Sequence, residues 1–126
     1  MADEFIRLES IKAHVNQVVF MPHISDPPHR PFGFVYFISI ENQSAFSVQV
    51  IARKWIVKEA DGKTLVVDGE GVVGEKPHIT SNDSFSYNSC HVVGSNSTAK
   101  GAFYGVLEDG RKVIIDIPEF ELNIPN

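Results

Sequence analysis

Apolar residues in this chain recur at every second position within short runs that end in turn residues, and this alternation most constrains its fold. In the run from 32 to 41, Phe34, Tyr36 and Ile38 fall on one side of an extended chain, since successive strand side chains point to opposite faces. No window of ten or more residues has the i, i+3, i+4, i+7 apolar spacing of an amphipathic helix. The chain is therefore predicted to be all-β.

Turn residues separate the apolar runs about every ten residues. Asn42-Gln43-Ser44 predicts a hairpin between runs 32–41 and 46–59, Asp61-Gly62 predicts a type I′ hairpin turn, and Asp109-Gly110 predicts a second hairpin. The proline-rich stretch 21–31 is expected to be a stiff loop, and Pro118 to end or bend the last pairing. About seven to nine short strands with such turns predict an antiparallel β-sandwich.

The length of 126 residues suits one domain. We expect it to span 1–126, with the sandwich over about 10–122 and an N-terminal arm over 1–9. Eleven basic against sixteen acidic residues, a net charge of −5, argue against nucleic acid as a partner. The single cysteine, Cys90, excludes an intrachain disulfide.

The beginning of the chain and its longest apolar run bear on its location. The start, Met1-Ala2-Asp3-Glu4, lacks the basic-then-apolar pattern of a secretory signal. The longest uncharged apolar-rich run, 31–40, is about half of the ~20 residues that a membrane helix needs. We therefore expect a cytoplasmic protein with no membrane partner.

Residues 68–77, here called the glycine segment, carry the pattern Gly69-x-Gly71-x-x-Gly74. This spacing matches phosphate-binding loops, in which glycines let backbone amides approach phosphate oxygens. A dinucleotide site also needs a helix that starts inside the motif, and Glu75-Lys76-Pro77-His78 has no helical periodicity. The favoured interpretation is a tight crossover between two sheets, where bulges and positive φ angles require glycine.

A small-ligand site at the same turn stays open as the alternative. Amides of Gly69, Gly71 and Gly74 would contact a pyrophosphate-bearing nucleotide, Arg53 or Lys76 would supply positive charge, and a divalent cation would accompany the ligand. Hydrolysis of such a ligand is a weaker possibility, because no general base is identifiable.

Several parts of the chain resemble the ApaG proteins, from about Ser10 to Leu122. The matching pieces occur in the family's order: Arg53-x-Trp55, Gly69-x-Gly71-Val72-Val73-Gly74-Glu75-x-Pro77, Phe85-x-Tyr87-x-Ser89, Gly101-x-x-Tyr104 and Ile117-Pro118-x-Phe120-x-Leu122. The departures, among them Lys76 in place of a glutamine and Cys90 in place of a glycine, lie in turns and at one strand end.

The resemblance implies a fibronectin type III-like or immunoglobulin-like sandwich and a small bacterial stand-alone protein. Related domains are appended to some eukaryotic F-box and polymerase-associated proteins, where they are credited with protein–protein contacts. The resemblance also implies an association with cobalt resistance and magnesium efflux, with no known catalytic reaction.

Individual polar residues give weaker signals. Trp55 is expected to anchor the core, on a face shared by Ile51, Arg53 and Val57. Cys90 and His91 are adjacent on a strand, so they are expected to face opposite sides and to form no catalytic pair. The five histidines are scattered and are interpreted as surface residues without a metal site: His14, His23, His29, His78 and His91.

No catalytic constellation emerges, and the identity of any metal is left unknown. Asp68, Glu70 and Glu75 offer oxygen atoms that suit magnesium or calcium, but charged residues on an exposed turn are the favoured interpretation. The leading hypothesis is a non-enzymatic binding module that recognises an unknown protein through the glycine segment and exposed strand faces. A homodimer through edge strands is also plausible.

Overall fold

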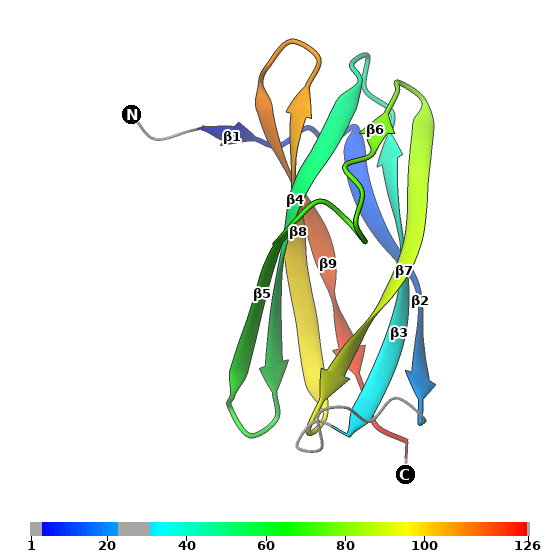
Figure 1. Ribbon diagram of the computed structural model, residues 1–126, viewed down its shortest axis with the longest axis vertical. Coiled ribbons are helices and arrows are strands. Elements are labelled where there is room, and N and C mark those ends of the chain that lie inside the picture. The colour runs from blue at the N-terminus through cyan, green and yellow to red at the C-terminus, as the bar shows by residue number, and fades with distance from the viewer. Residues whose placement is uncertain (1–3, 23–30, 126) are drawn as a thin grey trace.

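The computed structural model describes residues 4–22 and 31–125, and within them the chain forms nine strands and no helix (Figure 1). The prediction of an all-β chain is confirmed. Residues 23–30, in the predicted proline-rich loop, lie outside the described residues. The strands are β1 (Phe5–Ile6), β2 (Ile11–Met21), β3 (Phe32–Asn42), β4 (Val48–Glu59), β5 (Thr64–Glu70), β6 (His78–Ile79), β7 (Asp83–Val93), β8 (Ser97–Leu107) and β9 (Lys112–Leu122).

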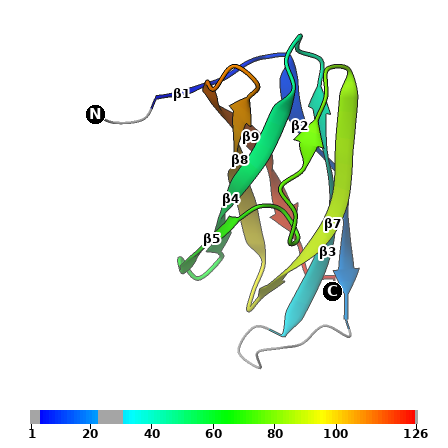
Figure 2. The ribbon, with the colours of Figure 1, turned by 45° about the horizontal axis from the view of Figure 1, so that its top comes forward.

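Two sheets face each other as the layers of a sandwich (Figures 1 and 2). Sheet A has six strands in the order β1-β9-β8-β4-β5, with β6 also paired to β4, and sheet B has three in the order β2-β3-β7. Every pairing is antiparallel except β1 with β9, which is parallel. Within the expected N-terminal arm, Phe5 and Ile6 form this short strand at the edge of sheet A.

The prediction of a hairpin between runs 32–41 and 46–59 was wrong, because β3 belongs to sheet B and β4 to sheet A. Asn42 holds the corner between the two sheets, and it is fully buried. Its side-chain amide donates to the carbonyl oxygens of Phe46 at 2.7 Å and Ile79 at 2.9 Å, and its Oδ1 accepts from the Ser44 amide at 3.0 Å. The polar turn therefore switches sheets rather than reversing within one.

One extra residue in β4 changes which of its side chains enter the core. Val50 pairs with Gly105 and Ala52 with Tyr104, so Ile51 has no partner of its own on β8. Such a β-bulge reverses the alternation beyond it. Val48 and Val50 accordingly share the inward face with Trp55 and Val57, contrary to the two faces predicted from strict alternation.

Pro118 lies at a second bulge, and it bends the pairing without ending it. Ala99 pairs with Phe120 and Gly101 with Ile117, so two residues of β9 face one of β8. Proline is tolerated at bulges because the ladder hydrogen bond there is already lost. β9 continues to Leu122, which is fully buried.

The Asp61-Gly62 turn connects β4 to β5 as predicted, but it is not of type I′. That type needs positive φ at both central residues, and Gly62 has φ +92° whereas Asp61 is not among the described residues with positive φ. The Glu59 amide instead donates to the Lys63 carbonyl across a longer loop. Asp109-Gly110 connects β8 to β9 in the same way, with the Leu107 amide donating to the Arg111 carbonyl.

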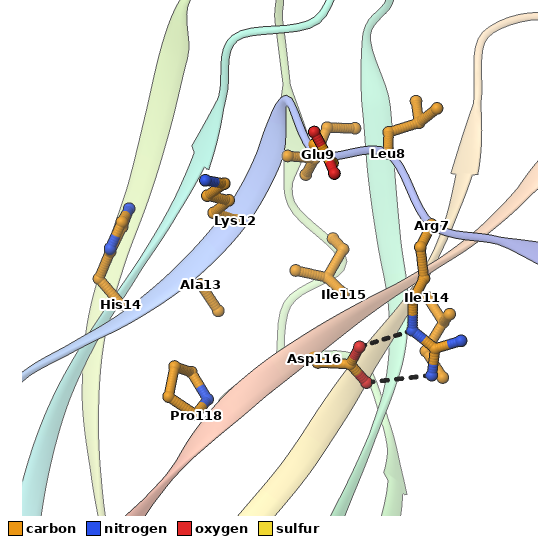
Figure 3. A pocket seen from close by; sticks show the side chains of 11 residues that line it. Arg7, Leu8, Glu9, Lys12, Ala13, His14, Ile114, Ile115, Asp116 and Pro118 are labelled. Carbon is orange, nitrogen blue, oxygen red and sulfur yellow. Dashed lines mark hydrogen bonds and ion pairs between the residues drawn. The ribbon is translucent and has the colours of Figure 1, made fainter.

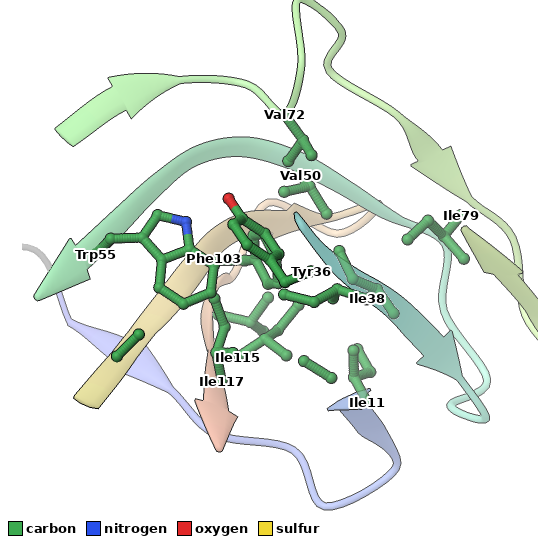
Figure 4. Packing of buried hydrophobic residues seen from close by; sticks show 14 of the residues in the cluster. Ile11, Tyr36, Ile38, Val50, Trp55, Val72, Ile79, Phe103, Ile115 and Ile117 are labelled. Carbon is green, nitrogen blue, oxygen red and sulfur yellow. The ribbon is translucent and has the colours of Figure 1, made fainter. Parts of the chain in front are cut away.

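The core fills the space between the sheets, and each of the nine strands contributes at least one side chain to it or packs one against it. Figure 4 shows part of this core. Trp55, Phe34, Phe103, Ile38 and Ile40 are its largest fully buried side chains. Trp55 is 1% exposed, so its prediction as a core anchor is confirmed.

Truncation of Phe103 should be far more costly than truncation of its neighbour Tyr104, because the two side chains point to opposite faces of β8. Phe103 is fully buried, whereas Tyr104 lies on the outer face, where it contacts Phe5. We expect Phe103→Ala to lower the free energy of unfolding by about 3–5 kcal/mol. Tyr104→Ala should lower it by less than half as much. Urea denaturation of both variants measures the difference, and equal losses would contradict the assigned faces.

Candidate ligand-binding site at the glycine segment

The glycine segment ends β5 and then makes a tight turn on sheet A. Val72 and Glu75 exchange two backbone hydrogen bonds of 2.7 and 3.0 Å around Val73 and Gly74. These two central residues have φ +46° and +81°, which makes a type I′ turn. The segment rejoins sheet A through β6, and the chain crosses to sheet B only between β6 and β7. Gly71 and Gly74 therefore serve a turn, and the chain crosses between the sheets only after them.

Each glycine of the motif has a separate local reason. Gly71 has φ +65°, and a Cβ there would lie 2.3 Å from the Glu75 carbonyl oxygen. Gly69 lies inside β5, where a Cβ would be 2.7 Å from Nη1 of Arg53. Gly74 has open space around it and needs glycine only for its φ angle.

The backbone amides of this segment are largely used inside the protein. The Gly71 amide donates to the Ile51 carbonyl at 2.7 Å, and the amides of Val72 and Glu75 donate to each other's carbonyls. A phosphate-binding loop instead keeps successive amides free to point at the ligand. This arrangement weakens the interpretation of the motif as a phosphate cradle.

Arg53 is the candidate residue that the fold brings closest to the motif. Its Nη1 donates to the carbonyl oxygens of Glu70 at 2.9 Å and Gly71 at 3.1 Å. Because of the bulge at Ile51, its side chain leaves β4 on the same side as Trp55, toward sheet B. Arg53 was predicted to share a face with Trp55, and the structure confirms that pair.

Lys76 lies at the other side of the turn. If Gly71 carried a Cβ atom, Cγ of Lys76 would be the side-chain atom nearest to it. The Lys76 ammonium group lies 3.7 Å from a carboxylate oxygen of Glu70. Glu70 is 88% exposed, and a solvated ion pair of this kind contributes little to stability. The fold thus gathers Gly69, Gly71 and Arg53 at one place and leaves Gly74 at the tip of the turn.

Aromatic side chains lie next to Arg53 between the two sheets. The Tyr36 ring centroid lies 5.0 Å from that of Trp55 and 4.7 Å from that of His91, and the Trp55 and His91 centroids are also 4.7 Å apart. Tyr87 lies 6.4 Å from Tyr36 in an edge contact. Figure 4 shows the Trp55 indole nitrogen and the Tyr36 hydroxyl on the same side of this cluster.

Burial shifts the pKa values of the titratable members of the cluster. It raises the pKa of the Tyr36 and Tyr87 hydroxyls above their usual range, an effect that the positive charge of Arg53 partly opposes. It lowers the pKa of His91 to about 4. His91 is 8% exposed, so its prediction as a surface residue was wrong. Its position in β7, four residues after Tyr87 on the inward face, is the sequence signal that would have revealed it.

The remaining histidines and Cys90 add nothing to this cluster. His14 and His78 are exposed, as predicted, and His23 and His29 lie outside the described residues. Cys90 is exposed where His91 is buried, which confirms that the two face opposite sides. In the described part of the chain, no group of three or more His, Cys, Asp or Glu side chains is placed to hold a metal ion.

A hollow of about 420 Å³ lies elsewhere, between the N-terminal segment, β2 and β9 (Figure 3). Arg7 at its rim donates from Nε and Nη2 to the two carboxylate oxygens of Asp116, at 2.5 and 3.3 Å. The cation there already has its counter-ion. Sequence reasoning gave no reason to single out this hollow, because Arg7 and Asp116 belong to opposite ends of the chain.

Comparisons with known proteins agree on one family. A family model described as the ApaG domain matches residues 22–107. The chain is 38% identical to Protein ApaG of Nitrosomonas europaea and 35% identical to Protein ApaG of Vibrio cholerae, with 94% and 96% of both chains covered. A crystal structure from Bordetella pertussis, described as an ApaA protein, superposes with a TM-score of 0.82 at 30% identity, covering 91% of this chain and 94% of that one.

Gly71→Ala should destabilise the protein more than Gly74→Ala. Both positions have positive φ, which costs a residue with a Cβ about 1–2 kcal/mol, but only at Gly71 does the Cβ also meet a backbone oxygen. We expect the Gly71 variant to lose at least about 1 kcal/mol more. Thermal or urea denaturation measures both, and equal losses would show that the turn relaxes freely.

His91 should make the protein less stable as the pH falls from 7 to 5. Its pKa is about 4 when folded and about 6.5 when unfolded, so the unfolded chain binds more protons in this range and stability is lost toward acid. The expected loss is about 2 kcal/mol. His91→Phe should remove this part of the pH dependence, whereas His78→Gln, at an exposed site, should retain it. Denaturation at both pH values decides, and an unchanged slope in His91→Phe would refute the assignment.

Proposed function

The chain belongs to the ApaG domain family, and from that premise we propose that it is a non-enzymatic binding module for a partner protein. The partner pairs with the free edge of β5 and contacts the adjoining turn of the glycine segment. Recognition by an added strand uses backbone hydrogen bonds for affinity and alternate side chains for specificity.

The exposed edge of sheet A carries this proposal. β5 ends the strand order of sheet A, and among the described residues it pairs only with β4. One row of its backbone groups is therefore available to a further strand. Val66 on β5 is 50% exposed and Val73 in the turn is 53% exposed. Together with Phe5 they are the large hydrophobic side chains that the described residues expose.

The family's association with cobalt resistance and magnesium efflux is, in this proposal, exerted through the partner. The acidic residues of the glycine segment support that assignment, because Glu70 pairs with Lys76 and Asp68 lies opposite Lys54 in the β4–β5 register. We place the recognition in the cytoplasm. No helix in the described ranges is long and apolar enough to cross a membrane.

We extend the fibronectin type III-like and immunoglobulin-like comparison to this chain as part of the same proposal. Its support is the strand order, in which β2-β3-β7 faces the sheet that contains β9-β8-β4-β5. Domains of such folds serve recognition in many unrelated proteins, with the specificity supplied by their loops and edges.

A pyrophosphate-bearing nucleotide with a divalent cation at the glycine turn is the weaker alternative. It needs free amides at the turn, whereas those of Gly71, Val72 and Glu75 donate inside the protein. A homodimer through β5 is the other alternative, because a second copy of the chain offers the same edge.

Introduction of a charge at Val66 should abolish partner binding, whereas the same change at Phe5 should not. Both side chains are exposed, but they lie at opposite edges of sheet A. We expect a photo-crosslinking amino acid at position 66 to give one discrete adduct in cells that express the protein natively. Val66→Asp should prevent co-purification of that partner, with Phe5→Asp as the matched control.

The mass of the adduct separates the remaining possibilities. An adduct of two 14.0 kDa chains would assign the edge to a homodimer and would have to agree with light scattering of the purified protein. Equal crosslinking from positions 5 and 66, or none from position 66, would contradict recognition at β5.

A further inference from the structure

Arg53 differs from the other arginines of the described residues in having no counter-ion. Arg7 is paired with Asp116 and Arg111 with Asp109, whose Oδ2 lies 2.7 Å from Nε of Arg111. Arg53 is half-buried, and within the described ranges no carboxylate lies within 4.0 Å of its guanidinium. Its Nη1 donates to two carbonyl oxygens, which are neutral. A cation withdrawn from water without a counter-charge is costly.

The side chains around Arg53 supply a second, independent observation. Three buried side-chain polar atoms of the described residues have no hydrogen-bond partner: Trp55 Nε1, Tyr87 Oη and His91 Nε2. Trp55 is 1% and His91 8% exposed. Buried polar groups are almost always hydrogen-bonded, and each orphan costs about 1–3 kcal/mol. Orphans that gather in one place indicate that something else completes them.

These orphans belong to one continuous group of side chains. Trp55 follows Arg53 by two residues on β4 and contacts both His91 and Tyr36, while Tyr87 contacts Tyr36. Burial raises the pKa of the Tyr36 and Tyr87 hydroxyls, and the positive charge of Arg53 opposes this to a smaller extent. Arg53 and Tyr87 are half-buried, whereas Trp55 and His91 lie deeper between the sheets.

We propose that Arg53, Trp55, Tyr87 and His91 form a site for a compact oxyanion, the group shared by phosphates and carboxylates. The guanidinium supplies the counter-charge and the Trp55 indole N–H and Tyr87 hydroxyl donate to the anion. His91 donates as well when its proton is on Nε2. The site is separate from the edge of β5, and it stands whether or not that edge binds a protein.

The chemistry of the group selects an anion over other ligands. The guanidinium and the indole are donors only, so a cation would find repulsion and few acceptors. Ordered water satisfies neutral orphans, but it brings no charge to balance Arg53. The ligand lies on the inter-sheet side of the glycine segment, because the carbonyls of Glu70 and Gly71 hold the guanidinium there.

β2 packs against β9, so the strand orders place β7 and β5 together on the opposite flank of the sandwich. Both are end strands in the described part of the chain, and β6 pairs with β4 on the same side as β5.

The single tryptophan provides a direct test. Trp55 is the only tryptophan of the chain, so its indole N–H gives one resonance in a ¹⁵N-labelled sample. We expect sodium phosphate or sodium acetate, added at constant ionic strength against sodium chloride, to move that resonance saturably. The anion with the lower Kd, phosphate or acetate, shows whether the natural ligand is a phosphate or a carboxylate compound.

Variants separate binding from general salt effects and from loss of folding. Arg53→Met should weaken binding at least about tenfold, the loss expected for charge-assisted hydrogen bonds, and Tyr87→Phe should weaken it with only one hydroxyl removed. Arg111→Met is the matched control, since Arg111 is an exposed arginine with its own carboxylate partner, and it should leave the Kd unchanged. The dispersion of the amide spectrum verifies that each variant is folded.

Three results would overturn the proposal. The first is an indole resonance that neither anion moves in the wild-type protein. The second is an indole resonance that the anion moves as much in folded Arg53→Met as in the wild-type protein. If Arg53→Met unfolds, the same result in Tyr87→Phe would count instead. The third is an indole resonance that sodium chloride moves as much as phosphate or acetate does, which would assign the effect to ionic strength.

Discussion

The extra residue that β4 carries at Ile51 decides what faces the interior of this protein. Without the bulge, Val48 and Val50 would share a face with Ile56, and Trp55 would point to solvent. With it, β4 delivers valines to the core at one end and Trp55 at the other, and it turns Arg53 toward sheet B. The Ile51 carbonyl also accepts from the Gly71 amide. A single backbone irregularity therefore fixes both the core and the start of the glycine turn.

The sequence predicted the strands and the all-β class because alternation and turn residues are local signals. The inward face of β3, with Phe34, Tyr36 and Ile38, follows directly from them. Bulges are not local in this sense, since they depend on which residue the partner strand presents. The alternation reverses in β4 and β9, and in β2 the register also shifts between Val15 and Gln17. Pattern analysis therefore could not predict which side chains face the core in the part of each strand that follows a bulge.

The candidate site shows the same division. Sequence reasoning placed Arg53 beside Trp55 and near the glycines, because the motif and the strand lie close in the chain. It missed Tyr87 and His91, which reach the cluster from the other sheet through pairing with β3. The sequence did not reveal that the chain changes sheets after Asn42, because the polar residues there are typical of a hairpin. In the structure, the Asn42 side chain donates to the Ile79 carbonyl oxygen and stabilises a corner between the sheets. Only the three-dimensional structure shows that Trp55 of sheet A contacts His91 of sheet B.

The parallel pairing of β1 with β9 has a consequence for synthesis in the cell. Phe5 pairs with Lys112 and Ile6 with Val113, so two strands that pair are far apart in the order of synthesis. Domains gain their long-range contacts only after the distant segment is available. Until β9 emerges, β8 has an open edge and the core lacks Ile115, Ile117 and Leu122. Because β9 is the last of the described strands, the edge of β8 and the core stay open to wrong strand partners until β9 is made.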